Sequence, residues 1–415
     1  MMKTPVAPRN PFVYGRILSV NDAACPRRQY EKAILETARN QGRLALVGDR
    51  RLGKSSLVER TLETHKIPVL RWDFQKVLSL EDLIRRAAED LDRFIGSLSP
   101  IARRVTPWLR EVGIAIQEIR LSYHGLGATL STHVPTDHLK RLLSVLLKIS
   151  SRKSFCLFID ELQDIKDRLP EREGEAVLGI LRGDLQHLKA PVFYAGSSRE
   201  SFRRIFTSDS SPFFESARLL EIEPFPAEDL LKFLITQFAR TGVSLAPETA
   251  LLILSIGGDS PNDIQHLAHE VWNFKTAKSI GTAEIKFAIA KILKDVAPVG
   301  ETWAANLTRR QMRALLATAL YDHLGSGTEE FMRAVGVDKT GAIPGVFKPC
   351  VSGPDPIVEK IGSHYRIRSR FLKLWLASQR HLIQEMIPTL REDARYQATL
   401  RQVCSGLFTD FKLES

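Results

Sequence analysis

The sequence predicts an α/β protein in which helices cover both faces of a parallel sheet, followed by a helical region and a small C-terminal domain. Three observations predict this fold. Over residues 26–224, short apolar runs alternate with helical patterns, which is typical of parallel sheets. Residues 227–294 hold four amphipathic helical patterns and no credible strand. Residues 308–380 combine helical patterns with two extended runs on either side of Gly362-Ser363.

The elements of the first region follow from apolar runs and from apolar spacing. Short apolar runs predict strands at 44–47, 68–73, 155–159, 192–195 and 219–222. Helices are predicted where apolar residues recur every three or four positions, as at Leu80, Leu83, Ile84 and Ala87. The predicted helices cover 26–41, 55–64, 78–94 and 138–149. Residues 95–135 are less regular and interrupt the alternation as an insert.

Shifts in composition divide the chain into five segments with one linker. These are an N-terminal irregular segment at 1–25, a core at 26–224, a helical region at 225–297, a C-terminal domain at 308–380 and a terminal helix at 381–415, with 298–307 as the linker. The C-terminal domain is predicted to begin with a helix capped by Thr308 and to continue through two shorter helices into the two extended runs. This order is typical of a winged helix.

The composition is that of an ordinary globular protein with an excess of positive charge. The 415 residues carry a formal net charge of +11, and the excess lies in residues 1–150 and 301–415. Such a balance favours a polyanionic partner such as nucleic acid. Basic residues gathered around a phosphate site are the alternative explanation.

Cysteine usage and hydropathy exclude several classes of protein. The four cysteines lie far apart without metal-ligand spacing, which indicates reduced thiols rather than disulfides or a zinc site. The first residues lack the apolar core of a signal peptide, and no run approaches the ~18 apolar residues of a membrane span. We therefore expect a cytoplasmic protein without a membrane partner.

A glycine-rich turn lies between the first predicted strand and the next predicted helix. It reads GDRRLGKS and matches the pattern G-x(4)-G-K-[ST]. Backbone amides of such a turn curl around a β-phosphate, the lysine reaches the β- and γ-oxygens, and the serine binds Mg²⁺. The sequence therefore predicts binding of ATP with Mg²⁺. The candidate nucleotide-binding residues are Gly48, Asp49, Arg50, Arg51, Leu52, Gly53, Lys54, Ser55 and Ser56.

Two carboxylates end the apolar strand at 155–159. Asp160 and Glu161 would lie at the carboxyl edge of the sheet, where ligands bind in open α/β folds. Asp160 is the candidate metal residue together with Ser55, and Glu161 is the candidate base that orients the attacking water. A phosphate sensor needs the first carboxylate and not the second. The pair therefore predicts slow hydrolysis, with Lys54 and Glu161 as catalytic residues.

Small polar residues follow the strand at 192–195. In many P-loop ATPases a polar residue at this position contacts the γ-phosphate and the attacking water, so Ser197 is a third catalytic candidate. An ordinary Gly-Ser turn is the alternative. Among the arginines that follow, Arg218 is the candidate for a finger that completes a neighbouring site. A solvated surface position is the alternative for Arg218.

Six stretches together resemble a known family: GDRRLGKSSLV, FIDELQDI, AGSSRESF, SPFF, GGDSPNDIQHLA and YRIRSRFLKLWL. Over about residues 10–380 the chain resembles the archaeal-type ATPases of the STAND/AAA+ group, which are relatives of origin-recognition ATPases. The resemblance implies a P-loop ATPase core of the ASCE class, an α-helical lid at 225–297 and a C-terminal winged helix.

The chain departs from the family pattern at several positions. The family often has an arginine soon after its SPxY segment, and Arg218 comes later here. Asn262 follows Pro261 where many relatives have a sensor arginine, so the resemblance implies a nucleotide contact for Pro261 itself. It also implies that Arg27, in CPRRQYE, lies near the adenine. Ser369-Arg370 replaces an Asp-Pro of the family and adds positive charge near the expected wing.

Two functions follow from these features. In the first, the nucleotide state of a slow ATPase gates binding of double-stranded DNA through the winged helix. The candidate DNA-binding residues are Lys339, Lys348, Arg366, Arg368 and Arg370. In the alternative, the protein is a STAND-type signalling ATPase that binds a protein partner or forms nucleotide-dependent homo-oligomers without DNA, as in stress or defence.

Overall fold

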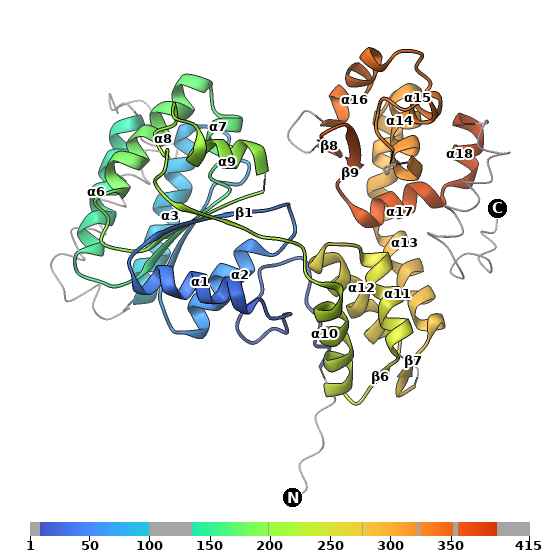
Figure 1. Ribbon diagram of the computed structural model, residues 1–415, viewed down its shortest axis with the longest axis horizontal. Helices are drawn as coiled ribbons and strands as arrows, with labels where there is room; N and C mark the ends of the chain where they lie inside the picture. Colours follow the sequence, from blue (N-terminus) through green and yellow to red (C-terminus); the bar gives the residue numbers. More distant parts are fainter. Residues whose placement is uncertain are drawn as a thin grey trace, which may run out of the picture. The chain divides into compact units, whose positions relative to one another are not determined.

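The computed structural model describes residues 9–98, 135–197, 199–275, 277–321, 324–351 and 356–387. The chain forms two compact units, which are described separately (Figure 1). One unit is Arg16–Pro224, and the other combines Met1–Gly15 with Phe225–Ser415. Most of the predicted insert at 95–135, and the predicted terminal helix beyond residue 387, lie outside the described residues. No described helix combines the length and apolar character needed to cross a bilayer.

The first unit contains a five-stranded sheet in the order β2-β3-β4-β1-β5. Every pair of neighbouring strands is parallel, so the carboxyl ends of all five strands meet at one edge. Strand β4 separates β1, which leads into the glycine-rich turn, from β3, which ends in Asp160. The strands are β1 (Arg43–Val47), β2 (Val69–Asp73), β3 (Cys156–Asp160), β4 (Val192–Gly196) and β5 (Arg218–Glu221). The five predicted strands and their α/β arrangement are confirmed.

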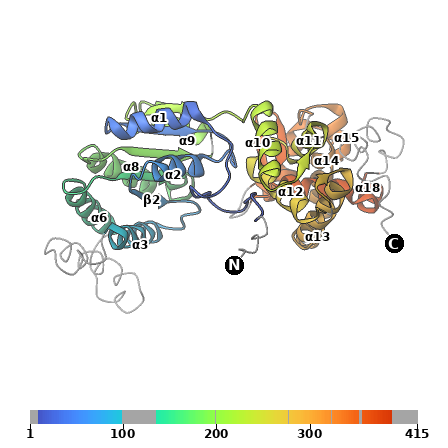
Figure 2. The same cartoon turned by 90° about the horizontal axis from the view of Figure 1, so that it is seen from below.

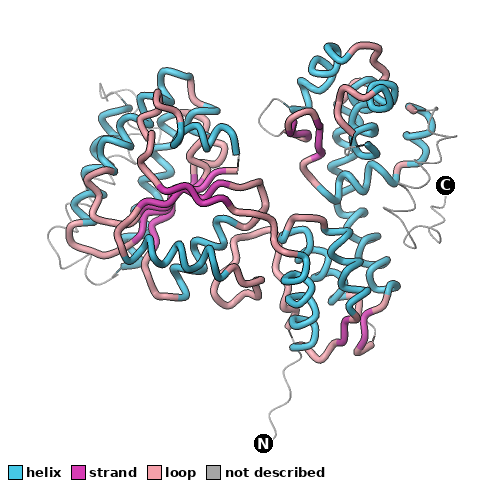
Figure 3. The backbone as a smooth tube through the Cα atoms, in the orientation of Figure 1, coloured by secondary structure: helices cyan, strands magenta, loops and turns pink. Residues whose placement is uncertain are grey.

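Helices cover both faces of the sheet (Figure 3). On one face lie α1 (Arg28–Arg39) and α2 (Lys54–Thr64). On the other lie α3 (Leu80–Leu98), α6 (Pro135–Ser150) and α8 (Glu171–Leu185), with α3 and α6 side by side (Figure 2). Two shorter helices, α7 (Asp164–Arg168) and α9 (Arg199–Thr207), follow β3 and β4. The four predicted helices of this unit are confirmed, with ends that differ by a few residues.

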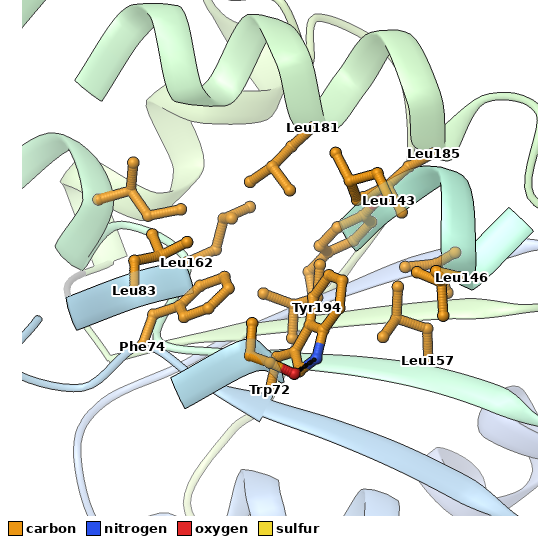
Figure 4. Packing of buried hydrophobic residues seen from close by; sticks show 14 of the residues in the cluster. Trp72, Phe74, Leu83, Leu143, Leu146, Leu157, Leu162, Leu181, Leu185 and Tyr194 are labelled. Atoms are coloured by element: carbon orange, nitrogen blue, oxygen red, sulfur yellow. Dashed lines mark hydrogen bonds between the residues drawn. The ribbon is translucent and has the colours of Figure 1, made fainter. Parts of the chain in front are cut away.

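The core of this unit forms because alternate residues of each strand face opposite layers. In β1, Ala45 and Val47 pack under α3, α6 and α8, whereas Leu44 and Leu46 pack against α1 and α2. Figure 4 shows the larger cluster around Trp72, whose indole Nε1 donates a hydrogen bond to the carbonyl oxygen of Ala87 at 3.1 Å. The one hydrogen-bond donor of the buried indole therefore has a partner. The sheet that carries the candidate site packs against this buried cluster.

The second unit begins with four helices, as predicted. They are α10 (Ala227–Arg240), α11 (Pro247–Gly257), α12 (Pro261–Asn273) and α13 (Thr282–Asn306). The expectation that this region has no strand is wrong. Two two-residue strands, β6 (Ser244–Leu245) and β7 (Ser279–Ile280), pair in parallel. Runs this short carry no periodic signal, and only the packing of the loops brings them together.

The predicted linker at 298–307 is also wrong, because α13 continues to Asn306 with Pro298 inside it. The local signals of Pro298 and Gly300 predict a break. In the structure, a Cβ atom at Gly300 would lie 2.2 Å from the Trp375 ring of α17 (Arg370–Ser378). Close packing of α17 on this part of α13 therefore outweighs the helix-breaking residues, and one helix joins the two halves of the unit.

The C-terminal part of the second unit contains the predicted order of elements. The order is α14 (Arg309–Tyr321), α15 (Glu329–Val335), the 3₁₀ turn η1 (Thr340–Ala342), α16 (Ile343–Val351), then β8 (Val358–Ile361) paired antiparallel with β9 (His364–Ile367). Two further helices follow, α17 and α18 (Arg380–Met386). The predicted cap is confirmed, because the Thr308 hydroxyl accepts a hydrogen bond from the Gln311 amide at 3.3 Å. Gly362, with φ of 58°, makes the turn between the two strands.

The close approach of Gly300 to Trp375 makes a stability prediction. Gly300→Ala should lower the free energy of unfolding by about 1–3 kcal/mol, because the added methyl group overlaps a rigid indole ring. Thermal and urea unfolding would measure the change. Gly345→Ala is the matched control, since a Cβ there meets no atom within 4 Å and alanine favours the helix by about 1 kcal/mol. Equal stabilities of the two variants would contradict the packing argument.

Candidate nucleotide-binding site

The glycine-rich turn of residues 48–55 runs from the end of β1 into the start of α2, as predicted. It is called the phosphate turn below, because its pattern predicts phosphate binding. At Gly48, a Cβ atom would lie 2.8 Å from the backbone oxygen of Ile222, which follows β5. A larger residue at this position would therefore push the turn away from the sheet. Arg51 and Gly53 both have positive φ, at 68° and 79°, and these two residues reverse the chain direction before α2 begins.

Lys54 lies inside this turn. Its side chain is 6% exposed, and its Nζ donates hydrogen bonds to the backbone oxygens of Gly48 at 2.8 Å and Asp49 at 2.9 Å. Burial lowers the pKa of Lys54, and the nearby carboxylates of Glu161 and Asp160 oppose that shift. The turn thus holds an ammonium group at its centre, where an incoming phosphate can replace the two carbonyl oxygens as its partner.

Ser55 and Asp160 meet although 105 positions separate them in the chain. The Ser55 hydroxyl donates a hydrogen bond to Asp160 Oδ2 at 2.5 Å. Asp160 is 3% exposed, and its burial raises the pKa while the Arg71 guanidinium and the Ser55 hydroxyl lower it. One hydroxyl and one carboxylate oxygen at the phosphate turn fit Mg²⁺, which takes few protein ligands and completes its shell with phosphate and water. The described residues include no group of three or more His, Cys, Asp or Glu arranged for a metal.

Sequence reasoning missed Arg71, which contacts the candidate metal residue. Its Nη2 lies 2.7 Å from Asp160 Oδ2 and 2.7 Å from Asp73 Oδ2, and its Nε lies 3.2 Å from Glu59 Oε1. Side chains alternate along β2, so Arg71 and Asp73 lie on the face opposite Trp72. Two charged residues on one face of a strand were a signal that the sequence offered for this cluster. The partner on β3 was not visible, because it depends on β2 and β3 being neighbours.

Glu161 is held by the end of β4. Its Oε2 accepts hydrogen bonds from the Ser197 amide at 3.1 Å, the Ser197 hydroxyl at 2.8 Å and Gln163 Nε2 at 2.5 Å. Its φ of 53° is one that residues other than glycine seldom adopt. The structure therefore brings together Glu161 and Ser197, which sequence reasoning selected separately. It adds Gln163, which that reasoning did not single out.

The other residues of the turn differ in their surroundings. Arg50 and Arg51 are exposed, and Leu52 is buried in the core under α1 and α2. The side chains of Ser56 and Ser55 have different partners. Its hydroxyl accepts a hydrogen bond from the Leu18 amide at 3.1 Å and so helps to hold the segment before α1 on α2.

Three further candidates lie at the start of α1, at the start of β5 and in the other unit. Arg27, at the start of α1, is 7% exposed with its guanidinium carbon 5.5 Å from the centre of the Tyr30 ring, and burial lowers its pKa. Arg218 is exposed at the first position of β5, so it lies at the amino end of the sheet, opposite the phosphate turn. There it lines an open cleft of about 670 Å³ with Arg43 and Phe214. Pro261 is the first residue of α12, in the second unit.

The candidate DNA-binding residues have different surroundings. Lys339 and Lys348 are exposed, and exposed Arg366 pairs with Glu359 at 2.8 Å. Arg368, just after β9, is half-buried. Arg370 donates hydrogen bonds to the backbone oxygens of two residues in the last turn of α11, Ile256 at 3.0 Å and Ser255 at 3.1 Å. Carbonyl groups at a helix end attract a cation, so the Arg370 guanidinium joins α17 to α11.

Comparisons agree with this architecture at the level of fold. No protein-family model matches the sequence, and no curated protein matches it. The structure is similar to that of a Walker-type ATPase of Pyrococcus abyssi, with a TM-score of 0.54 and 18% identity over 84% of this chain and 95% of that chain. It is also similar to the Orc1 protein of Aeropyrum pernix, solved in complex with DNA, with a TM-score of 0.49 and 14% identity over 91% and 95% of the two chains. The first similarity and the sheet order show the same α/β fold, in which helices cover both faces of a parallel sheet.

The contacts of Arg370 with α11 make a prediction about stability. Arg370→Ala should lower the free energy of unfolding by about 1–2 kcal/mol, because two carbonyl groups at the end of α11 lose a charged donor. Chemical denaturation would measure it. Arg366→Ala is the control, because exposed ion pairs contribute about 0–1 kcal/mol. If Arg370→Ala leaves stability at the wild-type value, its contacts with α11 are not stabilising.

Proposed function

We propose that this protein binds ATP with Mg²⁺ and hydrolyses it slowly. The observation that carries the proposal is the 2.5 Å contact between Ser55 of the phosphate turn and Asp160 of β3. Lys54 lies in the same turn and Glu161 follows Asp160, so four candidate residues lie at one edge of the sheet, which supports the proposal. The proposal also rests on the fold shared with a Walker-type ATPase.

Each residue has a distinct role in the proposed reaction. Lys54 would exchange its two carbonyl partners for β- and γ-phosphate oxygens, and Ser55 and Asp160 would hold Mg²⁺. When bound, the ion neutralises charge that develops on the phosphate oxygens. Glu161 orients a water molecule and accepts its proton as the water oxygen bonds to the γ-phosphorus and the bond to ADP breaks. Ser197 holds the Glu161 carboxylate in position through two hydrogen bonds.

The roles of Glu161 and Lys54 can be separated by measuring turnover and binding. Glu161→Gln should lower kcat by about 10²–10⁴-fold, because the amide cannot accept a proton, and should leave nucleotide affinity nearly unchanged. Lys54→Ala should lose affinity for ATP. Phosphate release and titration with a fluorescent nucleotide would measure the two quantities. Wild-type turnover by Glu161→Gln would remove Glu161 from the mechanism.

We further propose that the nucleotide state gates binding of double-stranded DNA through the C-terminal part of the second unit. The elements α14 to β9 follow the order of a winged helix, and exposed Lys339, Lys348 and Arg366 lie on it. The continuous helix α13 and the Arg370 contacts join this part to the helices of the proposed lid, which supports a coupling between them. The alternative, a signalling ATPase with a protein partner or nucleotide-dependent oligomers, uses the same connection without DNA.

Salt dependence distinguishes these two functions. If exposed basic residues contact phosphates, Lys348→Ala and Arg366→Ala should each weaken DNA binding and reduce the slope of log affinity against log salt by about 1. Fluorescence anisotropy with a DNA duplex at several salt concentrations, with and without ATP, would measure this. Oligomers that form with ATP and are indifferent to DNA would favour the signalling alternative.

A further inference from the structure

Arg71 is the central residue of a charged cluster that it forms with Glu59, Asp73 and Asp160. Its guanidinium reaches carboxylates from three elements: Glu59 of α2, Asp73 of β2 and Asp160 of β3. The Asp160 side chain is almost fully buried, whereas those of Arg71, Glu59 and Asp73 are partly exposed. Through Glu59, Arg71 thus adds a second link between Asp160 and α2, besides the direct contact of Ser55.

The geometry at Asp160 is set from two sides. Oδ2 of this carboxylate accepts one hydrogen bond from the Ser55 hydroxyl and another from Arg71 Nη2. Two donors on one oxygen restrict rotation of the carboxylate group, because turning it would break both bonds. Both bonds involve the carboxylate, and Arg71 adds the attraction of its own positive charge at an N–O distance of 2.7 Å.

The balance of charge in the cluster favours an added cation. Three carboxylates surround one guanidinium, so the four side chains together carry two more negative charges than positive ones. A divalent cation at Ser55 and Asp160 would compensate them. A carboxylate as deeply buried as Asp160 would be costly without a charged partner, and Arg71 is that partner when no cation is bound.

We propose that Arg71 is a positioning residue of the magnesium site, which holds the Asp160 carboxylate toward Ser55 so that Mg²⁺ binds together with the nucleotide. The inference rests on the proposed function, since it concerns the same phosphate turn. Because Arg71 contacts the candidate metal residue, we expect it to act on the part of nucleotide affinity that depends on Mg²⁺. Groups that orient a metal ligand in this way typically contribute roughly 10–100-fold to metal affinity.

The test measures the affinity for AMPPNP, an ATP analogue that is not hydrolysed, by calorimetry in excess MgCl₂ and in EDTA. For Arg71→Gln we expect affinity in EDTA close to wild type and affinity in MgCl₂ lower by roughly 10–100-fold. Arg71→Lys should show a smaller loss, because lysine keeps the charge but not the two-pronged geometry. It also keeps the test valid if the glutamine variant does not fold.

Asp73→Asn is the matched control. It removes one carboxylate partner of Arg71 and leaves the contact between Arg71 and Asp160 in place. Its ratio of affinities in MgCl₂ and EDTA should stay near wild type. Arg71 variants whose ratio of AMPPNP affinities in MgCl₂ and EDTA equals that of the wild type would overturn the inference. Variants that bind AMPPNP more tightly than wild type in MgCl₂ would also overturn it, because Arg71 would then compete with the cation. Wild-type protein that does not bind AMPPNP in either buffer would overturn the proposed function as well.

Discussion

The contact between Ser55 and Asp160 depends on the order of the strands, and the rest of the candidate site depends on that contact. Ser55 lies in the first turn of α2, the helix after β1, and Asp160 ends β3. Because all five strands are parallel, both residues emerge at the same edge, and β4 between them supplies Ser197 for Glu161. A sheet with another order would separate these side chains, although each would still follow its own strand.

Buried charge is the main constraint on the chemistry of this edge. Lys54 and Asp160 are both nearly inaccessible to water, and each has polar partners that compensate its burial. Lys54 uses backbone oxygens of the turn, which an incoming phosphate can replace. Asp160 uses Arg71 and Ser55, which can remain when a cation arrives. The carboxylate of Asp160 is therefore preorganised by partners that can stay in place, whereas Lys54 can exchange its partners for those of a ligand.

In the second unit, packing between segments that are distant in sequence joins the first four helices to the C-terminal elements. Helix α13 runs through the position where a linker was predicted, and Trp375 of α17 packs directly against Gly300. Arg370 adds a charged contact to the end of α11. These contacts connect the helices after Phe225 to the C-terminal elements.

Much of the architecture could be predicted because its signals are local. An apolar run, a glycine turn with lysine and serine, or a threonine cap is read from a few neighbouring residues, and all five strands and the phosphate turn were identified in this way. The two-residue strands β6 and β7 escaped detection, because two residues carry no periodicity. The continuity of α13 through Pro298 also escaped detection, because the packing that maintains it comes from residues some 75 positions later.

The sequence by itself determined the candidate residues for phosphate chemistry, because Lys54, Ser55, Asp160 and Glu161 are defined by short motifs next to strands. Only the tertiary structure decided what holds them. The Arg71 cluster needs β2 beside β3, and the Glu161 hydrogen bonds need β4 beside β3. The Arg370 contact needs α17 beside α11. Such contacts join segments whose distance in the chain says nothing about their distance in space, so no local pattern records them.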